Sequence, residues 1–122
     1  MILADTSVWI DHFRWGSQEM AKALHQGQIV MHPYVTAELA LGSLQDRART
    51  LAMLDFLPQV RVAQLSELRL MIEARSLYNL GIAFTDAHLI ASVFLNPGTV
   101  LWTRDKRLRA VAEHLRIHGP LP

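Results

Sequence analysis

The chain has 122 residues, no cysteine and a formal net charge of only +1. This length fits a single domain over residues 1–122 with a core of its own. The lack of cysteine excludes disulfides, thiolate nucleophiles and cysteine zinc sites, and it suits a reducing compartment. No secretory signal pattern and no run of about eighteen apolar residues is present, so we expect a soluble, cytoplasmic protein with no membrane partner.

Arginine supplies ten of the twelve basic residues, and its planar fork pairs well with phosphate oxygens. Four cations crowd one stretch, namely Arg104, Lys106, Arg107 and Arg109. Pattern alone leaves open whether they bind phosphates or form a solvated helix face. Hydrophobic residues reach 51%, a small excess that indicates some apolar surface covered by a partner.

Short apolar runs alternate with helical patterns along the chain. The first run, Ile2–Ala4, is typical of a strand buried on both faces. Further strands are predicted at 29–31, 60–63 and 99–102, with an edge strand at 116–118. The predicted helices cover 7–13, 17–25, 33–44, 46–57 and 66–80. Two more helices are predicted, one from 85 or 86 to 95 and one from 105 to about 115.

This alternation predicts an α/β fold: a mainly parallel sheet of four or five strands, flanked by helices in a three-layer sandwich. In open sheets of this kind, sites form beyond the carboxyl ends of the strands. Asp5 ends the first predicted strand, and Asp105 lies just past the strand at 99–102. We therefore expect these two carboxylates at the same edge of the sheet.

Two further acids occupy apolar helical patterns. Glu38 has Val35 three residues before it and Leu41 three after, which places all three on one predicted inward face. Asp86 has apolar residues at offsets of three and four. A charge on an inward face costs several kcal/mol unless it is paired or binds a metal.

Each of the four acids also has a simpler interpretation. Asp5, Asp86 and Asp105 can cap helices, and Glu38 can pair with an arginine. One metal site, in contrast, explains all four together. Two carboxylates about 4 Å apart repel by roughly 4 kcal/mol at an effective dielectric of 20, so a cluster of four calls for a cation. An oxygen-only ligand set suits Mg²⁺, with Mn²⁺ as a substitute.

In this hypothesis Asp5, Asp86 and Asp105 hold the metal, and Glu38 completes the catalytic cluster. Ser7 and Thr103 flank the outer acids, where their hydroxyls can orient carboxylates or a metal-bound water. Each hydroxyl can equally be a local backbone cap. The predicted contacts to RNA phosphates are Arg104 and Arg107.

Four segments in order resemble the motifs of VapC-type toxins of the PIN-domain family. They are Ile2–Asp11, Val35–Gly42, Thr85–Ala91 and Leu101–Asp105. The resemblance implies a parallel sheet ordered 3-2-1-4-5 between helices. It also implies four acids that hold a divalent metal and hydrolyse RNA phosphodiester bonds.

Such toxins block translation by cutting structured RNA. The resemblance therefore implies an RNA substrate, a VapB-like antitoxin that covers the site, and a homodimer. His88 stands where the family often has a small or apolar residue, and we expect it to be partly exposed.

Two other functions stay open at this point. Acids at the carboxyl edge of a parallel sheet also serve receiver domains and aspartate phosphatases, although Ser7 replaces the second phosphatase aspartate and Lys106 matches the receiver lysine poorly. The other alternative is a non-catalytic RNA-binding module on the same surface. Dependence of RNA cleavage on Mg²⁺ distinguishes it from a nuclease.

Overall fold

The computed structural model describes residues 1–122 and places three short parallel strands at the centre, in the order β2-β1-β3. The elements in chain order are β1 (Ile2–Ala4), α1 (Thr6–Trp15), α2 (Gln18–His25), β2 (Ile29–Val30), α3 (Pro33–Ala40), α4 (Arg47–Phe56), α5 (Leu65–Ala74), α6 (Phe84–Leu95), β3 (Val100–Trp102) and α7 (Lys106–His114). The predicted α/β class with a parallel sheet is thereby confirmed.

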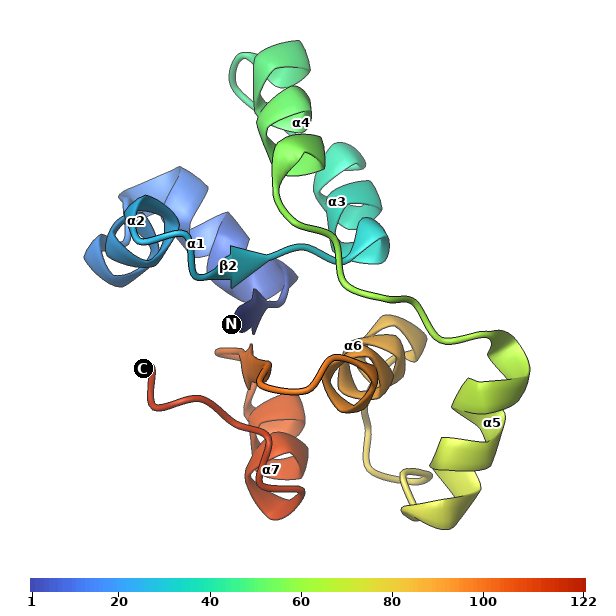
Figure 1. Ribbon diagram of the computed structural model, residues 1–122. Coiled ribbons are helices and arrows are strands. Elements are labelled where there is room, and N and C mark those ends of the chain that lie inside the picture. The colour runs from blue at the N-terminus through green and yellow to red at the C-terminus, as the bar shows by residue number, and fades with distance from the viewer.

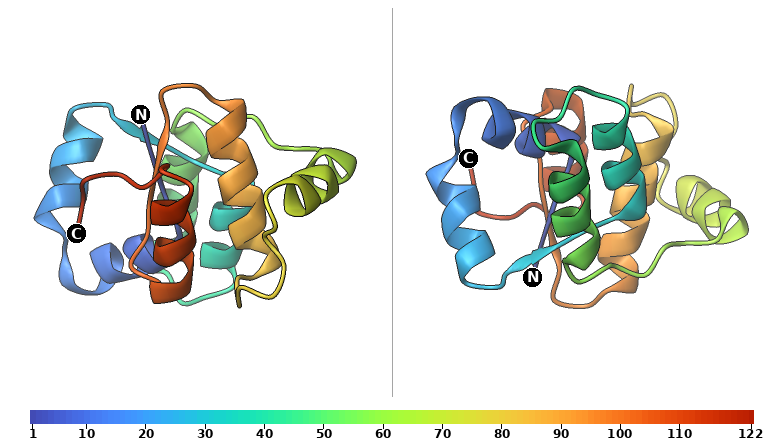
Figure 2. Two further views of the ribbon diagram at one scale, coloured as in Figure 1. Left: turned by 90° about the horizontal axis from the view of Figure 1, so that it is seen from below. Right: turned by 90° about the horizontal axis from the view of Figure 1, so that it is seen from above.

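Helices surround the strands on every side. Figure 1 shows α1 and α2 on one side of the strands and α6 on the other, with α3 and α4 above and α7 below. Both views in Figure 2 show α5 projecting beyond α6 at the margin of the molecule. No helix combines the length and the apolar character that a membrane crossing needs.

The strand predicted at 60–63 is wrong. The chain pairs with β2 only through a single parallel bridge between Met31 and Gln59. Beyond it, the backbone of Arg61 bonds to α6 instead: its N–H donates to the side chain of Asn96 and its carbonyl accepts from the hydroxyl of Ser92. The ladder stops because the next donor to the Val60 carbonyl would be Pro33, which has no N–H and opens α3.

The predicted edge strand at 116–118 is also reduced to one parallel bridge, between Leu101 and His118. Leu101 makes both bonds of this bridge, since it donates its N–H to the Ile117 carbonyl and accepts the N–H of Gly119. With both bridges counted, the lateral order matches the expected 3-2-1-4-5, but the two outer strands are one residue long.

Two predicted helices end earlier than expected. The helix predicted over 33–44 stops at Ala40, and the one predicted over 66–80 stops at Ala74. Ser76 and Asn79 adopt positive φ angles of 53° and 60°, which a continuing helix does not allow. That helix also begins earlier, because the Glu67 carboxylate accepts the N–H of its cap residue at 2.9 Å.

The main core packs around β1 and β3. Leu3, Leu101 and Trp102 in the strands and Trp9 in α1 are fully buried. Because β1 is the middle strand and is covered by helices, loss of one of its side chains leaves a cavity that the surroundings cannot fill.

Leu3→Ala tests this role of β1. We expect the free energy of unfolding to fall by about 2–5 kcal/mol, since the removed side chain leaves a buried cavity. Leu70→Ala is the matched control, because Leu70 is 72% exposed, and it should change stability by less than about 0.5 kcal/mol. Urea unfolding followed by circular dichroism measures both, and equal losses would contradict the assignment of the core.

Candidate metal and active site

Asp5 is the most buried of the four candidate acids, with an exposed fraction of 5%. It follows β1 and forms the N-cap of α1, where Oδ1 accepts the N–H of Val8 at 3.3 Å. The same oxygen accepts the hydroxyl of Ser7 at 2.5 Å, and Oδ2 accepts the hydroxyl of Thr103 at 2.5 Å. Both oxygens of Asp5 are therefore fixed in orientation.

Thr103 connects Asp5 to the end of β3. Its fully buried hydroxyl donates to Asp5 and accepts the N–H of Asp105 at 3.0 Å. Asp105 is the N-cap of α7, and its Oδ1 accepts the N–H of Leu108 at 2.9 Å. The carboxylate itself is exposed, and its Oδ2 makes no hydrogen bond within the chain.

Asp86 lies in the first turn of α6 and is half-buried. Its Oδ2 accepts the N–H of Ala83 at 2.9 Å, which ties the carboxylate to the helix N-terminus. Three of the four acids thus accept backbone N–H groups at the starts of α1, α6 and α7. The positive ends of these helix dipoles partly offset the repulsion between the carboxylates.

Glu38 differs from the expected inward position. It is exposed on α3, and its Oε2 accepts the hydroxyl of Thr6 at 2.6 Å. The prediction of an inward face with Leu41 is wrong, because the buried residues of α3 are Val35 and Leu39 and Leu41 is 90% exposed. Thr6 opens α1 next to Asp5, so this contact still brings Glu38 toward the cluster.

Asp86 responds electrostatically to all three other acids. Burial raises its pKa first, the hydrogen bond from Ala83 lowers it, and the charges of Asp5, Asp105 and Glu38 each raise it further. Burial also raises the pKa of Asp5, against the hydrogen bonds that stabilise its charge. The structure therefore brings the four predicted residues into one electrostatic cluster.

No cation of the chain compensates this cluster. The two ion pairs of the protein join Arg104 to Asp11 at 3.0 Å and Arg109 to Glu113 at 3.2 Å, and neither includes a cluster acid. Uncompensated carboxylates that approach one another raise their proton affinity, or they bind a cation from solution.

A divalent cation that keeps part of its water shell fits this arrangement better than a closed cage. No three acidic or histidine side chains converge closely enough to hold one ion together directly. Mg²⁺ commonly binds through one or two carboxylates and retains several waters. The exposed Asp105 and Glu38 leave space for such waters, and the donor set consists only of oxygens.

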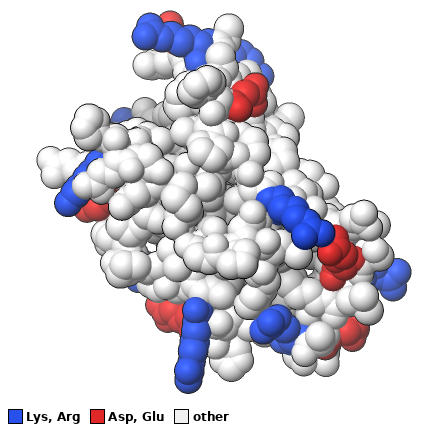
Figure 3. Space-filling view, in the orientation of Figure 1, with Lys and Arg blue, Asp and Glu red and all other residues white.

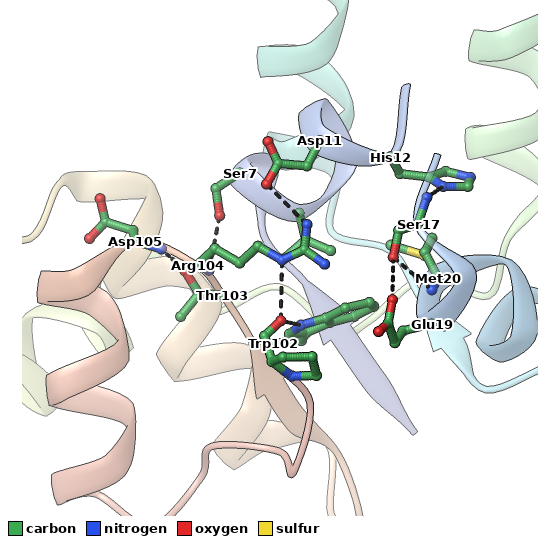
Figure 4. Close-up of polar contacts among 12 residues, drawn as sticks. Ser7, Asp11, His12, Ser17, Glu19, Met20, Trp102, Thr103, Arg104 and Asp105 are labelled. Atoms are coloured by element: carbon green, nitrogen blue, oxygen red, sulfur yellow. Dashed lines mark hydrogen bonds and ion pairs between the residues drawn. The ribbon is translucent and has the colours of Figure 1, made fainter. Parts of the chain in front are cut away.

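The two predicted phosphate contacts have different surroundings. Figure 4 shows the Arg104 side chain directed toward Asp11 and away from Asp105. Its Nε also donates to the Pro122 carbonyl at 3.2 Å, so this guanidinium already has protein partners. Arg107 instead packs against Gly81, where an added Cβ would lie 2.9 Å from its side chain.

The same arginine lines a cleft along α7 that has cations but no acid in its wall. Arg75, Lys106 and His114 line it together with Arg107. Lys106 and Arg107 lie in the first turn of α7, where positive charge is unfavourable to the helix dipole. Helix stability therefore does not account for this placement.

Sequence reasoning missed an aromatic group beside the acids. His88 is 2% exposed, so the expectation of a partly exposed histidine is wrong. It contacts the rings of Tyr34 and Phe84, both with centroids at 4.7 Å. The sequence did hold an indication of this group, since each of these two aromatic residues precedes a cluster acid by four residues or fewer.

Comparison with known proteins agrees with this geometry. The PIN domain family matches residues 2–114. Two curated relatives, both called Ribonuclease VapC32, come from Mycobacterium tuberculosis strains CDC 1551 / Oshkosh and ATCC 25618 / H37Rv. Each is 43% identical over 110 residues, which covers 90% of this chain and 89% of the relative. The chain therefore belongs to the PIN-domain family, and its likeness to VapC members confirms the resemblance seen in the motifs.

The raised pKa values predict a pH-dependent stability without metal. A carboxyl whose pKa is raised in the folded state binds its proton more tightly there than in the unfolded chain. Its ionisation therefore lowers stability at neutral pH, and the loss is recovered as pH falls through the raised pKa. The buried histidines act in the opposite sense, because burial lowers their pKa and the unfolded chain binds their protons more tightly as pH falls. The carboxylate effect is therefore measured as the difference in EDTA between wild type and a variant that lacks one of the charges.

Asp86→Asn removes one charge from the cluster while its amide oxygen can still accept from Ala83. We expect this variant to be more stable than wild type at neutral pH in EDTA, by roughly 0.5–2 kcal/mol, and this difference should shrink as pH falls through the raised pKa of Asp86. Asp55→Asn is the control, because Asp55 is exposed on α4 and has no ion pair. A less stable Asp86→Asn variant under these conditions would contradict charge repulsion in the cluster.

Proposed function

We propose that this chain is a VapC-type endoribonuclease that hydrolyses RNA phosphodiester bonds with Mg²⁺, for which Mn²⁺ can substitute. The observation that carries the proposal is that one buried hydroxyl, that of Thr103, joins the Asp5 carboxylate after β1 to the backbone of Asp105 after β3, while no protein cation pairs with either acid. The membership in the PIN-domain family and the ribonuclease names of the two relatives support it.

Asp5, Asp86 and Asp105 are the residues that would hold the metal, directly or through water. When bound, the ion would polarise the scissile phosphate and lower the pKa of a coordinated water. Glu38 is exposed at the rim, where its carboxylate can orient the attacking water and take up its proton. Ser7 and Thr103 hold both oxygens of Asp5 in place during this step.

Arg107 is the first candidate to bind a flanking phosphate, because no acid of the chain pairs with it. Arg104 would reach a phosphate only after release from Asp11. The receiver or phosphatase alternative fits poorly, because the PIN domain family matches residues 2–114 and Ser7 stands where a phosphatase has its second aspartate.

The biological setting follows from the same proposal. The chain would act in the cytoplasm as the toxin of a toxin–antitoxin pair, blocking translation by cutting structured RNA. A VapB-like antitoxin and a second copy of the chain are the expected partners. Uncovered apolar side chains support protein partners, since Phe56 is 91% and Trp15 80% exposed. Figure 3 likewise shows a broad central area without charged side chains on one face.

Loss of single carboxylates tests the nuclease. Asp86→Asn and Asp105→Asn should each reduce Mg²⁺-dependent RNA cleavage at least about 100-fold, because metal binding weakens while the helix caps remain possible. Cleavage of a labelled RNA measured against Mg²⁺ concentration gives the result, and Asp55→Asn should cleave normally. RNA that is bound but never cut by wild type at any Mg²⁺ or Mn²⁺ concentration would favour the non-catalytic binding module.

Arg107→Gln tests the phosphate contact. We expect a higher KM with little change in kcat. The slope of the logarithm of the RNA-binding constant against the logarithm of salt concentration should become shallower by about one. Arg116→Gln is a matched control, because Arg116 is exposed after α7 and lies outside the basic cleft. Identical KM values and salt slopes for wild type and Arg107→Gln would remove Arg107 from the substrate path.

A further inference from the structure

Four rings from the starts of α3 and α6 meet beside the acid cluster. We call His32, Tyr34, Phe84 and His88 the aromatic box. The ring of His88 touches those of Tyr34 and Phe84 edge-on, with centroids 4.7 Å away in both cases. His32 meets Tyr34 edge-on at 5.0 Å. Three edge-to-face contacts, the geometry that aromatic pairs prefer, therefore hold the box together.

The box has a buried half and an exposed half. His32 and His88 are 0% and 2% exposed, whereas Tyr34 is 36% and Phe84 57% exposed. The two exposed rings lie nearly parallel, with centroids at 6.3 Å and 25° between their planes. Buried rings thus fix two solvent-facing rings in one orientation, so a ligand that stacks on them has little side-chain entropy to remove.

The two histidines support the box without adding charge to it. Burial and the neighbouring His88 lower the pKa of His32 to about 4, and burial lowers the pKa of His88. The Nδ1 of His32 accepts the N–H of Tyr34 at 3.0 Å, which fixes the ring at the start of α3. The neutral imidazoles therefore neither pair with the carboxylates nor explain why the outer rings stay exposed.

The two exposed rings lie on the same helices as two of the acids that would face the RNA. Tyr34 lies one helical turn before Glu38 on α3, on the same face. Phe84 precedes Asp86 by two residues, so the two side chains leave the first turn of α6 in different directions. The rings bridge α3 and α6, whereas Arg107 and the basic cleft belong to α7 and the segment before α6.

We propose that Tyr34 and Phe84 form a stacking site for an unpaired nucleobase next to the phosphate held at the acid cluster. This inference rests on the proposed nuclease function and deepens it. A base offers a flat π-face that aromatic side chains bind with little sequence preference. Only loops, bulges and single strands offer an unstacked base, so the substrate class is RNA that is unpaired at the point of cleavage.

A fluorescent base tests stacking without cleavage. Short ribo-oligonucleotides carrying 2-aminopurine at successive positions are titrated with the Asp105→Asn chain, which is expected to bind but not to cut. Stacking on an aromatic ring quenches this fluorophore, so we expect quenching at one position. The double variant Asp105→Asn with Phe84→Leu should show no such quenching, and it should bind the oligonucleotide about ten-fold more weakly. Phe56→Leu, the same change at another exposed ring, should have no effect.

A cleavage assay with the wild-type catalytic residues completes the test. Phe84→Leu should lower kcat/KM about ten-fold on a hairpin with an unpaired loop. The protein should still fold, with a melting temperature only a few degrees lower at most, because Phe84 is 57% exposed and loses one edge-on contact. Equal cleavage and equal quenching by Phe84→Leu and its parent would overturn the stacking site while the nuclease stands. Quenching that depends on Phe84 in a chain that never cuts RNA would instead overturn the nuclease, so the two failures are distinguishable.

Discussion

The hydrogen bond from the Thr103 hydroxyl to Asp5 is the contact on which the site depends. It joins the residue after β1 to the residue after β3, two positions 98 residues apart in the chain. The same hydroxyl accepts the N–H of Asp105, so one buried side chain sets the spacing of two carboxylates. Because Asp5 is nearly inaccessible, loss of this donor would leave part of a buried charge unpaired, which costs more than the bond itself contributes.

Helix capping and metal binding are often treated as alternative roles for an acid, but the proposed metal ligands are themselves the capping side chains. Asp5, Asp86 and Asp105 each accept a backbone N–H at a helix start. Asp105 uses one oxygen for the cap and leaves the other without a protein partner. The cap fixes the carboxylate and the helix dipole stabilises its charge, so capping prepares the residue for a cation rather than competing with one.

The parts of the fold that sequence predicted are those set by local pattern. Apolar runs identified β1, β2 and β3, whereas the joint metal role of the four acids stays a prediction. The strand at 60–63 failed because the next backbone donor on the β2 side would be Pro33, which has no N–H and opens α3. Glu38 was placed on the wrong face because the buried residues of α3 are Val35 and Leu39, one turn apart. The aromatic box was not predicted, because its rings meet only where α3 and α6 pack side by side, which is a tertiary contact.

Charge distribution around the site argues that the missing positive charge comes from solution. Arginines do lie nearby, yet Arg104 is matched to Asp11 and Arg109 to Glu113, so the chain satisfies these cations with acids outside the cluster. Had either arginine turned to Asp105, the repulsion would fall and the folded chain would gain stability. A protein selected only for stability has no reason to keep the acids unpaired, whereas a metal-dependent enzyme does, because an internal cation would compete with the ion that activates water.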